Sequence, residues 1–232
     1  MRFDVLTLFP ELIEAHMSYS IMKRAVDDGV IEVNTVNPRD YTLDKHKKVD
    51  DTPFGGGAGM VLMPQPYVDC YEGVIRKENS VTVMMTPQGE PFNDRISDEL
   101  AKYDQIIILC GHYEGFDERI REIIKPREIS IGDFVLTGGE LPALCLIDAV
   151  SRKIEGTLGK IESAHDDSFS DGLLEYPQYT KPREYRGLEV PEVLLGGNHK
   201  LINEYRKEQK ILRTKAKRPD LWEKYVKNKH SR

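Results

Sequence analysis

Hydrophobic and polar positions alternate loosely over residues 1–9, which is the pattern of a half-buried strand. From Pro10 onward, apolar side chains recur every three or four positions until Gly29. This spacing predicts one helix that starts at a proline and ends at a glycine. Residues 30–36 alternate again and predict a second strand. A strand, a helix and a strand in this order are typical of a parallel α/β sheet.

Two later segments are short apolar runs bounded by turn-forming residues. Residues 81–86 and 105–110 have this pattern, which predicts strands of a sheet covered on both faces. Helices are expected over residues 93–102, 117–124 and 139–152. The last of these is mostly apolar, so we expect it to be well buried.

Neither the alternation typical of strands nor the three-to-four spacing typical of helices continues after these helices. Residues 159–187 are polar and rich in Gly, Pro and Ser, which predicts a linker or a mobile loop. A basic amphipathic helix is expected over residues 199–214, a turn at 218–220 and a short helix at 221–227. The chain therefore predicts a small helical C-terminal domain.

The composition is that of an ordinary globular protein. The chain has 232 residues, of which 39% are hydrophobic and 31% charged, which excludes collagenous, wholly disordered and membrane-spanning classes. The N-terminus has acidic residues where a signal peptide would be apolar, so we expect a cytoplasmic protein without membrane association. Three cysteines, Cys70, Cys110 and Cys145, lack metal or disulfide spacing and are expected to be reduced.

Charge is distributed unevenly along the chain. The net charge is −6, but residues 200–232 carry 12 Lys and Arg against 4 acidic residues, a net charge of +8. The first 199 residues therefore carry a net charge of −14. A basic end on an acidic protein indicates a surface that attracts a polyanion.

Three glycine clusters are candidate binding loops. Residues 53–60 match neither the P-loop nor the Rossmann spacing, so this cluster is either a turn or a ligand loop. Residues 109–119 follow a predicted strand, where they form either a ligand site or a turn that ends at the helix cap Asp117. Residues 130–142 either wrap an adenosine or form a strand and a capped helix.

Candidate chemistry outside these clusters is sparse. The acids at positions 166 and 167 lie in a non-periodic loop, where they are either solvated or poised as a general base. His46 and His112 are not paired at metal-ligand spacing, so no metal site is expected.

Nine short motifs, in order along the chain, together resemble one family, and the match runs from residue 1 to about 220. They occupy residues 8–10, 38–40, 49–51, 53–60, 110–115, 130–133, 138–142, 167–169 and 194–199. The chain resembles the bacterial tRNA (guanine-N1)-methyltransferases, which modify the guanosine at position 37, next to the anticodon.

The resemblance implies an architecture that periodicity does not. It implies an α/β fold in which a parallel-sheet SPOUT domain with a deep trefoil knot is followed by a small all-helical C-terminal domain. The implied domains are a knotted, S-adenosylmethionine-binding catalytic domain over residues 1–160, a flexible linker over 161–187 and a basic tRNA-binding domain over 188–232. The family also implies an obligate homodimer whose active sites are built from both chains.

The resemblance assigns site residues by position. The residues implied to bind S-adenosylmethionine are Pro87, Gly111, Tyr113, Glu114, Ile131, Gly132, Asp133, Phe134, Val135, Leu136, Gly138, Gly139, Glu140 and Pro142. The residues implied to bind the tRNA substrate are Asp50, Gly57, Gly59, His112, Lys215, Lys217 and Arg218.

The implied chemistry needs a base, because N1 of guanine carries a proton at neutral pH. Asp167 matches the family's base, and Arg152 matches the cation that stabilises negative charge on O6. Glu114 and Asp133 are candidates to hold the sulfonium of the donor. Family members also use Mg²⁺, for which the sequence shows no dedicated ligands. The alternatives are a knotted methyltransferase acting on another RNA position and a non-enzymatic RNA-binding module.

Overall fold

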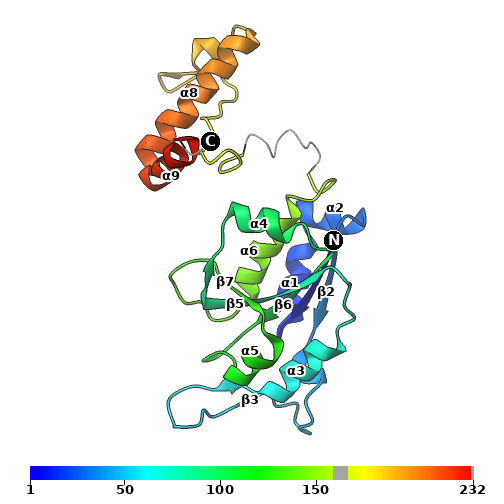
Figure 1. Ribbon diagram of the computed structural model, residues 1–232. Coiled ribbons are helices and arrows are strands. Elements are labelled where there is room, and N and C mark those ends of the chain that lie inside the picture. The colour runs from blue at the N-terminus through cyan, green and yellow to red at the C-terminus, as the bar shows by residue number, and fades with distance from the viewer. Residues whose placement is uncertain (159–166, 231–232) are drawn as a thin grey trace. The chain divides into compact units, whose positions relative to one another are not determined.

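The computed structural model describes residues 1–158 and 167–230. The chain forms two compact units, Met1–Gly159 and Lys160–Arg232, and each is described by itself (Figure 1). Within the described residues, no helix is both long and apolar enough to cross a membrane.

The N-terminal unit is built on a five-stranded sheet. Its strands, in the order in which they hydrogen-bond, are β2 (Glu32–Val36), β1 (Arg2–Leu6), β6 (Gln105–Cys110), β5 (Ser80–Pro91) and β7 (Arg127–Ser130). All neighbouring strands are parallel, which confirms the predicted α/β sheet. The short strands β3 (Asp50–Asp51) and β4 (Val61–Leu62) form a separate antiparallel pair.

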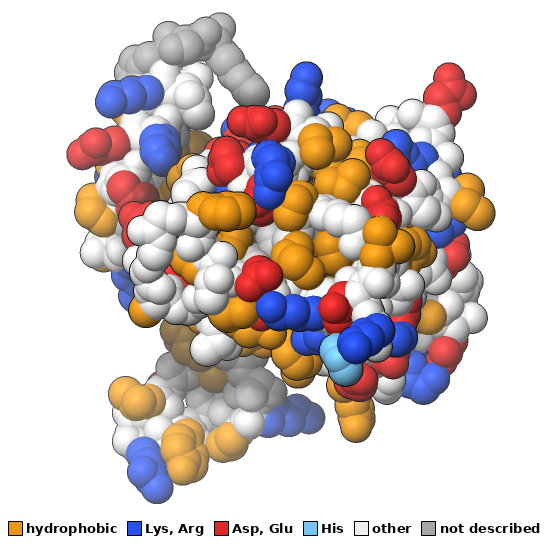
Figure 2. Space-filling view, turned by 90° about the horizontal axis from the view of Figure 1, so that it is seen from below, with side chains coloured by type: hydrophobic (Ala, Val, Ile, Leu, Met, Phe, Trp, Pro, Cys, Tyr) orange, Lys and Arg blue, Asp and Glu red, His pale blue; other side chains and the backbone are white. Residues whose placement is uncertain are grey.

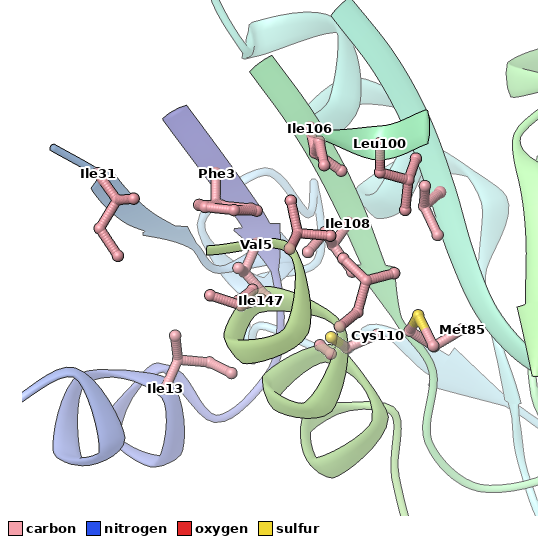
Figure 3. Packing of buried hydrophobic residues seen from close by; sticks show 14 of the residues in the cluster. Phe3, Val5, Ile13, Ile31, Met85, Leu100, Ile106, Ile108, Cys110 and Ile147 are labelled. Carbon is pink, nitrogen blue, oxygen red and sulfur yellow. The ribbon is translucent and has the colours of Figure 1, made fainter. Parts of the chain in front are cut away.

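Helices cover both faces of this sheet. They are α1 (Pro10–Met17), α2 (Ser20–Asp27), α3 (Pro64–Gly73), α4 (Asp94–Leu100), α5 (Glu118–Ile124) and α6 (Glu140–Ser151), with a 3₁₀ turn η1 at Pro38–Asp40. One hydrophobic cluster joins α1, α2, α4 and α6 to one face of the sheet (Figure 3). A second cluster joins α3 and α5 to the other face.

The central strand β6 shows why the sheet needs a continuous apolar run. All six of its residues are buried. Ile106 and Ile108 belong to the first cluster, whereas Ile107 and Leu109 belong to the second. Since successive side chains of a strand point to opposite faces, a strand with helices on both sides must be apolar at every position.

The prediction of one helix from Pro10 to Gly29 is wrong in one respect, because the chain forms two helices there. Helix α1 ends at Met17, and Ser20 adopts a positive φ of 53° at the start of α2. The hydroxyl of Ser18 donates a hydrogen bond to the carbonyl oxygen of Glu14 at 2.7 Å. Such a local side-chain bond competes with the helical pattern and favours its end.

Strand β5 is longer than the apolar run 81–86 because it contains a bulge. It pairs with β7 at residues 83–85 and again at residues 90–91, and the register shifts between these stretches. At Gly89, a Cβ atom would overlap the backbone of Ile129, so only glycine permits this close approach. The bulge carries Thr86, Pro87 and Gln88 out of the ladder.

The C-terminal unit contains α8 (His199–Lys217), α9 (Pro219–His230), the 3₁₀ turn η2 (Glu192–Leu194) and a hairpin of β8 (Glu184–Tyr185) and β9 (Leu188–Glu189). This unit is therefore helical but not purely so.

Much of the segment expected to be a flexible linker instead packs on α8. Leu173 and Tyr176 are buried, and the backbone NH of Leu174 donates to the Thr214 hydroxyl at 2.9 Å. Lys210 forms an ion pair with Asp171 at 2.6 Å. Buried apolar side chains within a polar, non-periodic segment explain why the sequence pattern did not indicate this packing.

Candidate functional site

A cavity of about 300 Å³ lies where three loops of the N-terminal unit meet. These loops are the bulge of β5, the segment that follows β6 and the segment that follows β7. Twelve of the fourteen residues expected to bind the donor line the cavity: Pro87, Gly111, Tyr113, Glu114, Ile131, Gly132, Phe134, Val135, Leu136, Gly138, Gly139 and Pro142. His112 lines it as well. Phe116 and Thr137, from the glycine clusters 109–119 and 130–142, also line it. Met85, Thr86, Gln88 and Arg121 line it too, although none of the glycine clusters contains them.

Glycines allow two of these loops to touch. The backbone NH of Gly139 donates to the Gly111 carbonyl oxygen at 2.8 Å, and His112 forms an isolated bridge with Gly138. A Cβ atom on Gly139 would lie 2.7 Å from the Cα of Cys110. Gly139 is therefore required by contact between two backbone segments, in addition to its place on the cavity wall.

Glu140 does not line the cavity, but its side chain contacts His112, which does. Its side chain is only 2% exposed, and its Oε2 lies 2.6 Å from Nε2 of His112. Its Oε1 accepts a hydrogen bond of 2.6 Å from the hydroxyl of Thr7, at the end of β1. Sequence reasoning missed Thr7, because a lone threonine 133 positions away from its partner carries no signal. Asp133 also lies off the lining.

Burial keeps two neighbouring groups neutral. Burial raises the pKa of the Cys110 thiol and of the Tyr67 hydroxyl well above their usual values, and the charge of Glu140 adds to both shifts. Tyr67 donates a hydrogen bond of 3.2 Å to the Cys110 carbonyl oxygen. Neither group is therefore an ionised nucleophile at neutral pH.

The apolar side of the cavity is partly open to solvent. Phe134 and Val135, in the loop after β7, are 54% and 85% exposed. The end of the N-terminal unit at which α3, α5 and β3 lie in Figure 1 is viewed from below in Figure 2. Hydrophobic side chains gather across the middle of that face, with charged side chains among and around them. Such an exposed apolar surface is typical of a binding site.

Hydrogen bonds join the first glycine cluster, residues 53–60, and the strand after it to the segment that follows β6, which we call the cavity loop. The Glu114 backbone NH donates to the Met60 carbonyl oxygen at 3.0 Å, and that of Leu62 donates to the Gly115 carbonyl oxygen at 2.9 Å. Gly59 has a φ of +86°, and a Cβ atom there would overlap the Glu114 carboxyl group.

The expected tRNA-binding residues of the N-terminal unit belong to segments that hydrogen-bond to one another. Asp50 pairs with Leu62 across the β3–β4 ladder. Gly57 and Gly59 belong to the loop between these two strands, next to the cavity loop that carries Glu114.

The two expected catalytic residues belong to different units. Arg152 caps the C-terminal end of α6 in the N-terminal unit and is partly buried. Asp167 belongs to the C-terminal unit, where its carbonyl oxygen accepts a hydrogen bond of 2.8 Å from the Ser170 hydroxyl. Asp166 and His165 lie outside the described residues.

The cations expected to bind tRNA lie at the C-terminal end of α8. Lys215 places its ammonium 4.5 Å from the centre of the Trp222 ring, and Arg218 forms an ion pair with Asp220 at 2.7 Å. Two of the three are thus engaged within their own unit, and Lys217 is exposed. No cluster of three or more metal-ligating side chains occurs among the residues that the structure describes.

Comparison with known proteins gives a consistent result. A family model described as tRNA (Guanine-1)-methyltransferase TrmD matches residues 1–224. A tRNA (guanine-N(1)-)-methyltransferase from Staphylococcus epidermidis is 56% identical over 97% of this chain and 92% of its own length. Proteins with the same name from Staphylococcus carnosus and Staphylococcus aureus are 55% and 56% identical over the same shares of both chains.

Proposed function

The chain belongs to the tRNA (guanine-1)-methyltransferase TrmD family, and from this premise we propose that it methylates N1 of the guanosine at position 37 of tRNA. Methyltransferases of this family use S-adenosylmethionine as the methyl donor. The observation that carries the proposal is the match of nearly the whole chain to this family, together with the cavity formed by the three loops.

The cavity fits the donor in size and lining. A volume of about 300 Å³ lies at the lower end of the range for small-molecule sites, which is about 300–1,000 Å³. Ile131, Leu136 and Phe134 offer apolar surface for an adenosine, and glycine backbone can approach it closely. Glu114 supplies a carboxylate on the same wall, suited to a cationic sulfonium.

The reaction assigns separate tasks to the two catalytic residues. When bound, the donor would supply a methyl group on positively charged sulfur, and its carbon–sulfur bond would break as the bond to N1 forms, so that the sulfur leaves as a neutral thioether. Asp167 removes the N1 proton, because protonated N1 has no free electron pair for attack. Negative charge then moves onto O6, where the guanidinium of Arg152 stabilises it.

A magnesium requirement, which the resemblance implies, has no support in the side chains described. Since they contain no cluster of three ligands, we derive no step through the metal. Chelation of Mg²⁺ during methyl transfer tests the requirement directly.

The proposal gives each part of the chain a role. Residues 1–160 form a knotted donor-binding domain, in which hydrogen bonds between residues 111–112 and residues 138–139 join two loops of the cavity. Residues 161–187 carry the base, and residues 188–232 bind tRNA through their positive charge, with Lys215, Lys217 and Arg218 among the contacts. Because tRNA is the substrate, the enzyme acts in the cytoplasm.

We also propose that two copies of the chain form a homodimer. Phe9, Leu12 and Leu141 are 41%, 49% and 53% exposed on the contacting elements around α1 and α6. Exposed apolar side chains on packed helices are typical of a surface that a second chain covers. In this dimer, both chains contribute to each active site.

The decisive experiment is nucleoside analysis of tRNA after incubation with labelled S-adenosylmethionine. N1-methylguanosine at position 37 is expected, whereas a ribose-methylated product would support the other knotted methyltransferases. Absence of donor binding in calorimetry would support a simple RNA-binding module.

The base assignment is tested with Asp167→Asn. Donor affinity should remain, while the single-turnover rate falls by roughly 10²–10⁴, the usual effect of losing a general base. Glu189→Gln, an exposed change of the same kind in the same unit, is the control. A rate within a few-fold of the wild type would remove Asp167 from this role.

A further inference from the structure

A second cavity, of about 500 Å³, lies within the C-terminal unit. It opens between the N-terminal half of α8 and the segment from Tyr176 to Leu195, which lies beside that end of the helix (Figure 1). We call it the α8 cavity. Its apolar and aromatic lining includes Tyr179, Leu194 and Ile202.

Three cations line the same cavity and no carboxylate does. Lys181, Arg183 and Arg206 contribute to the lining, and no Asp or Glu side chain among the described residues joins them. Within the described residues, none of the three forms an ion pair. Two other cations of this unit do form ion pairs, Lys210 with Asp171 and Arg218 with Asp220.

Arg206 is held in place at the wall of the cavity. Its guanidinium carbon lies 4.6 Å from the centre of the Tyr176 ring, which is 7% exposed. Its Nε is buried and has no hydrogen-bond partner among the described residues. A buried donor without a partner is costly in a folded protein, and a ligand oxygen would satisfy it.

The lining matches the two chemistries of one nucleotide. Aromatic and apolar surface is suited to the face of a base, which stacks on such side chains in single-stranded RNA. Guanidinium groups bind phosphate with paired hydrogen bonds. If an uncharged apolar peptide segment occupied the cavity instead, the three cations would face it without partners, which is unfavourable.

We propose that the α8 cavity is a subsite for one unpaired or splayed nucleotide of the tRNA, distinct from the guanosine that is methylated. Its base stacks on Tyr179 and the apolar floor, while Arg183, Lys181 and Arg206 hold its phosphate. This inference rests on the proposed function, because it takes tRNA as the substrate. It places RNA contacts at the N-terminal half of α8, in addition to the cations at the C-terminal end of that helix.

The charge component is tested by equilibrium binding of a tRNA transcript to the full chain at several salt concentrations. Arg183→Gln with Arg206→Gln should raise the Kd about tenfold and reduce the salt slope by roughly one to two units. Lys77→Gln with Lys102→Gln removes the same charge from exposed positions of the N-terminal unit and should change the Kd by less than about threefold. Because Arg206 packs on Tyr176, Arg183→Gln is also measured alone, since Arg183 is exposed.

The stacking component is tested separately with Tyr179, which is 47% exposed. Tyr179→Ala should raise the Kd for tRNA about fivefold or more, whereas Tyr179→Phe should restore binding because it keeps the ring. The salt slope should not change in either variant, because stacking releases no counterions.

The outcomes distinguish the subsite from the proposed function. If the wild type methylates tRNA but Arg183→Gln and Tyr179→Ala bind it with wild-type Kd and salt slope, the subsite is wrong and the function stands. If the wild type binds tRNA through these residues without methylating it, the proposed function fails and the subsite stands. In either case, donor affinity measured by calorimetry should be the same in all variants.

Discussion

At the scale of single residues, Glu140 connects three parts of the chain that are remote in sequence. Its carboxylate contacts Thr7 from the end of β1 and His112 from the loop after β6, while its own backbone begins α6. A buried carboxylate is stable only when such partners surround it. The position of the cavity wall at His112 therefore depends on a residue that does not itself line the cavity.

The first prediction concerns this carboxylate. Glu140→Gln replaces an oxygen that accepts a hydrogen bond with a group that donates one, so either Thr7 or His112 loses its acceptor. We expect the free energy of unfolding to fall by about 1–3 kcal/mol and donor affinity to weaken several-fold as His112 shifts. Urea unfolding and calorimetry measure the two effects, and Glu11→Gln, exposed in the first turn of α1, is the control. Unchanged stability and affinity would show that the network does not position the wall.

The second prediction concerns thiol reactivity. Burial, with a smaller contribution from Asp40, raises the pKa of the Cys70 thiol to about 12, and burial raises the pKa of the Cys110 thiol well above its usual value. Both thiols should therefore resist a thiol reagent at pH 8 in the folded protein and react after unfolding. In the unfolded chain these thiols ionise near pH ~8.5, so stability should decline as pH rises from there toward 12. Rapid labelling of Cys70 in the native protein would contradict this assignment.

At the scale of elements, the sequence predicted those strands and helices that an apolar run or a capping side chain determines locally. The run at 105–110 coincides with β6, and Asn93 and Asp117 cap α4 and α5 through their side chains. Helix α3 was missed because Pro64 and Pro66 stand in its first turn and its apolar positions have no clear period. The glycine clusters indicated the cavity loops, but only tertiary structure shows which glycines meet backbone, as Gly139 does.

The third prediction treats the glycine loop between β3 and β4 as one element with the cavity loop. Gly59 and Gly55 both have φ near +87°, at +86° and +88°, so alanine strains the backbone equally at either position. Only at Gly59 does the added Cβ meet another residue, the Glu114 carboxyl group. Gly59→Ala should therefore weaken donor binding by displacing Glu114, while Gly55→Ala should not. Equal donor affinities of the Gly59→Ala and Gly55→Ala proteins in calorimetry would show that the two loops do not act as one element.

At the scale of the whole molecule, two surface features suit two different partners. The positive charge is concentrated in the last 33 residues, and Phe9, Leu12 and Leu141 are exposed apolar side chains around α1 and α6 of the N-terminal unit. The first feature suits a polyanionic substrate, and the second suits a second copy of the chain.

The fourth prediction tests that second copy. Leu141→Glu should convert the dimer to a monomer in analytical ultracentrifugation and abolish methyl transfer, because a buried, unpaired charge at an interface is strongly unfavourable. Ile75→Glu, at a side chain that is 79% exposed after α3, is the control and should remain dimeric. Cys145 on α6 is exposed in the single chain, so its labelling rate should rise in the Leu141 variant. A dimeric Leu141→Glu protein would place the interface elsewhere.

Strand β1 hydrogen-bonds to two strands that lie at very different distances along the chain, and this affects how the protein is made. Arg2 pairs with Glu32 on one side and with Gln105 on the other. At a synthesis rate of ~5–20 residues per second, the roughly 70 residues between β2 and β6 take about 4–14 s to add. During that interval the ribosome-bound chain presents an apolar strand with one open edge, which is the form most prone to join another chain. A chaperone that covers this edge, or faster synthesis, would therefore reduce wrong pairing of the nascent N-terminal half until β6 emerges and closes the centre of the sheet.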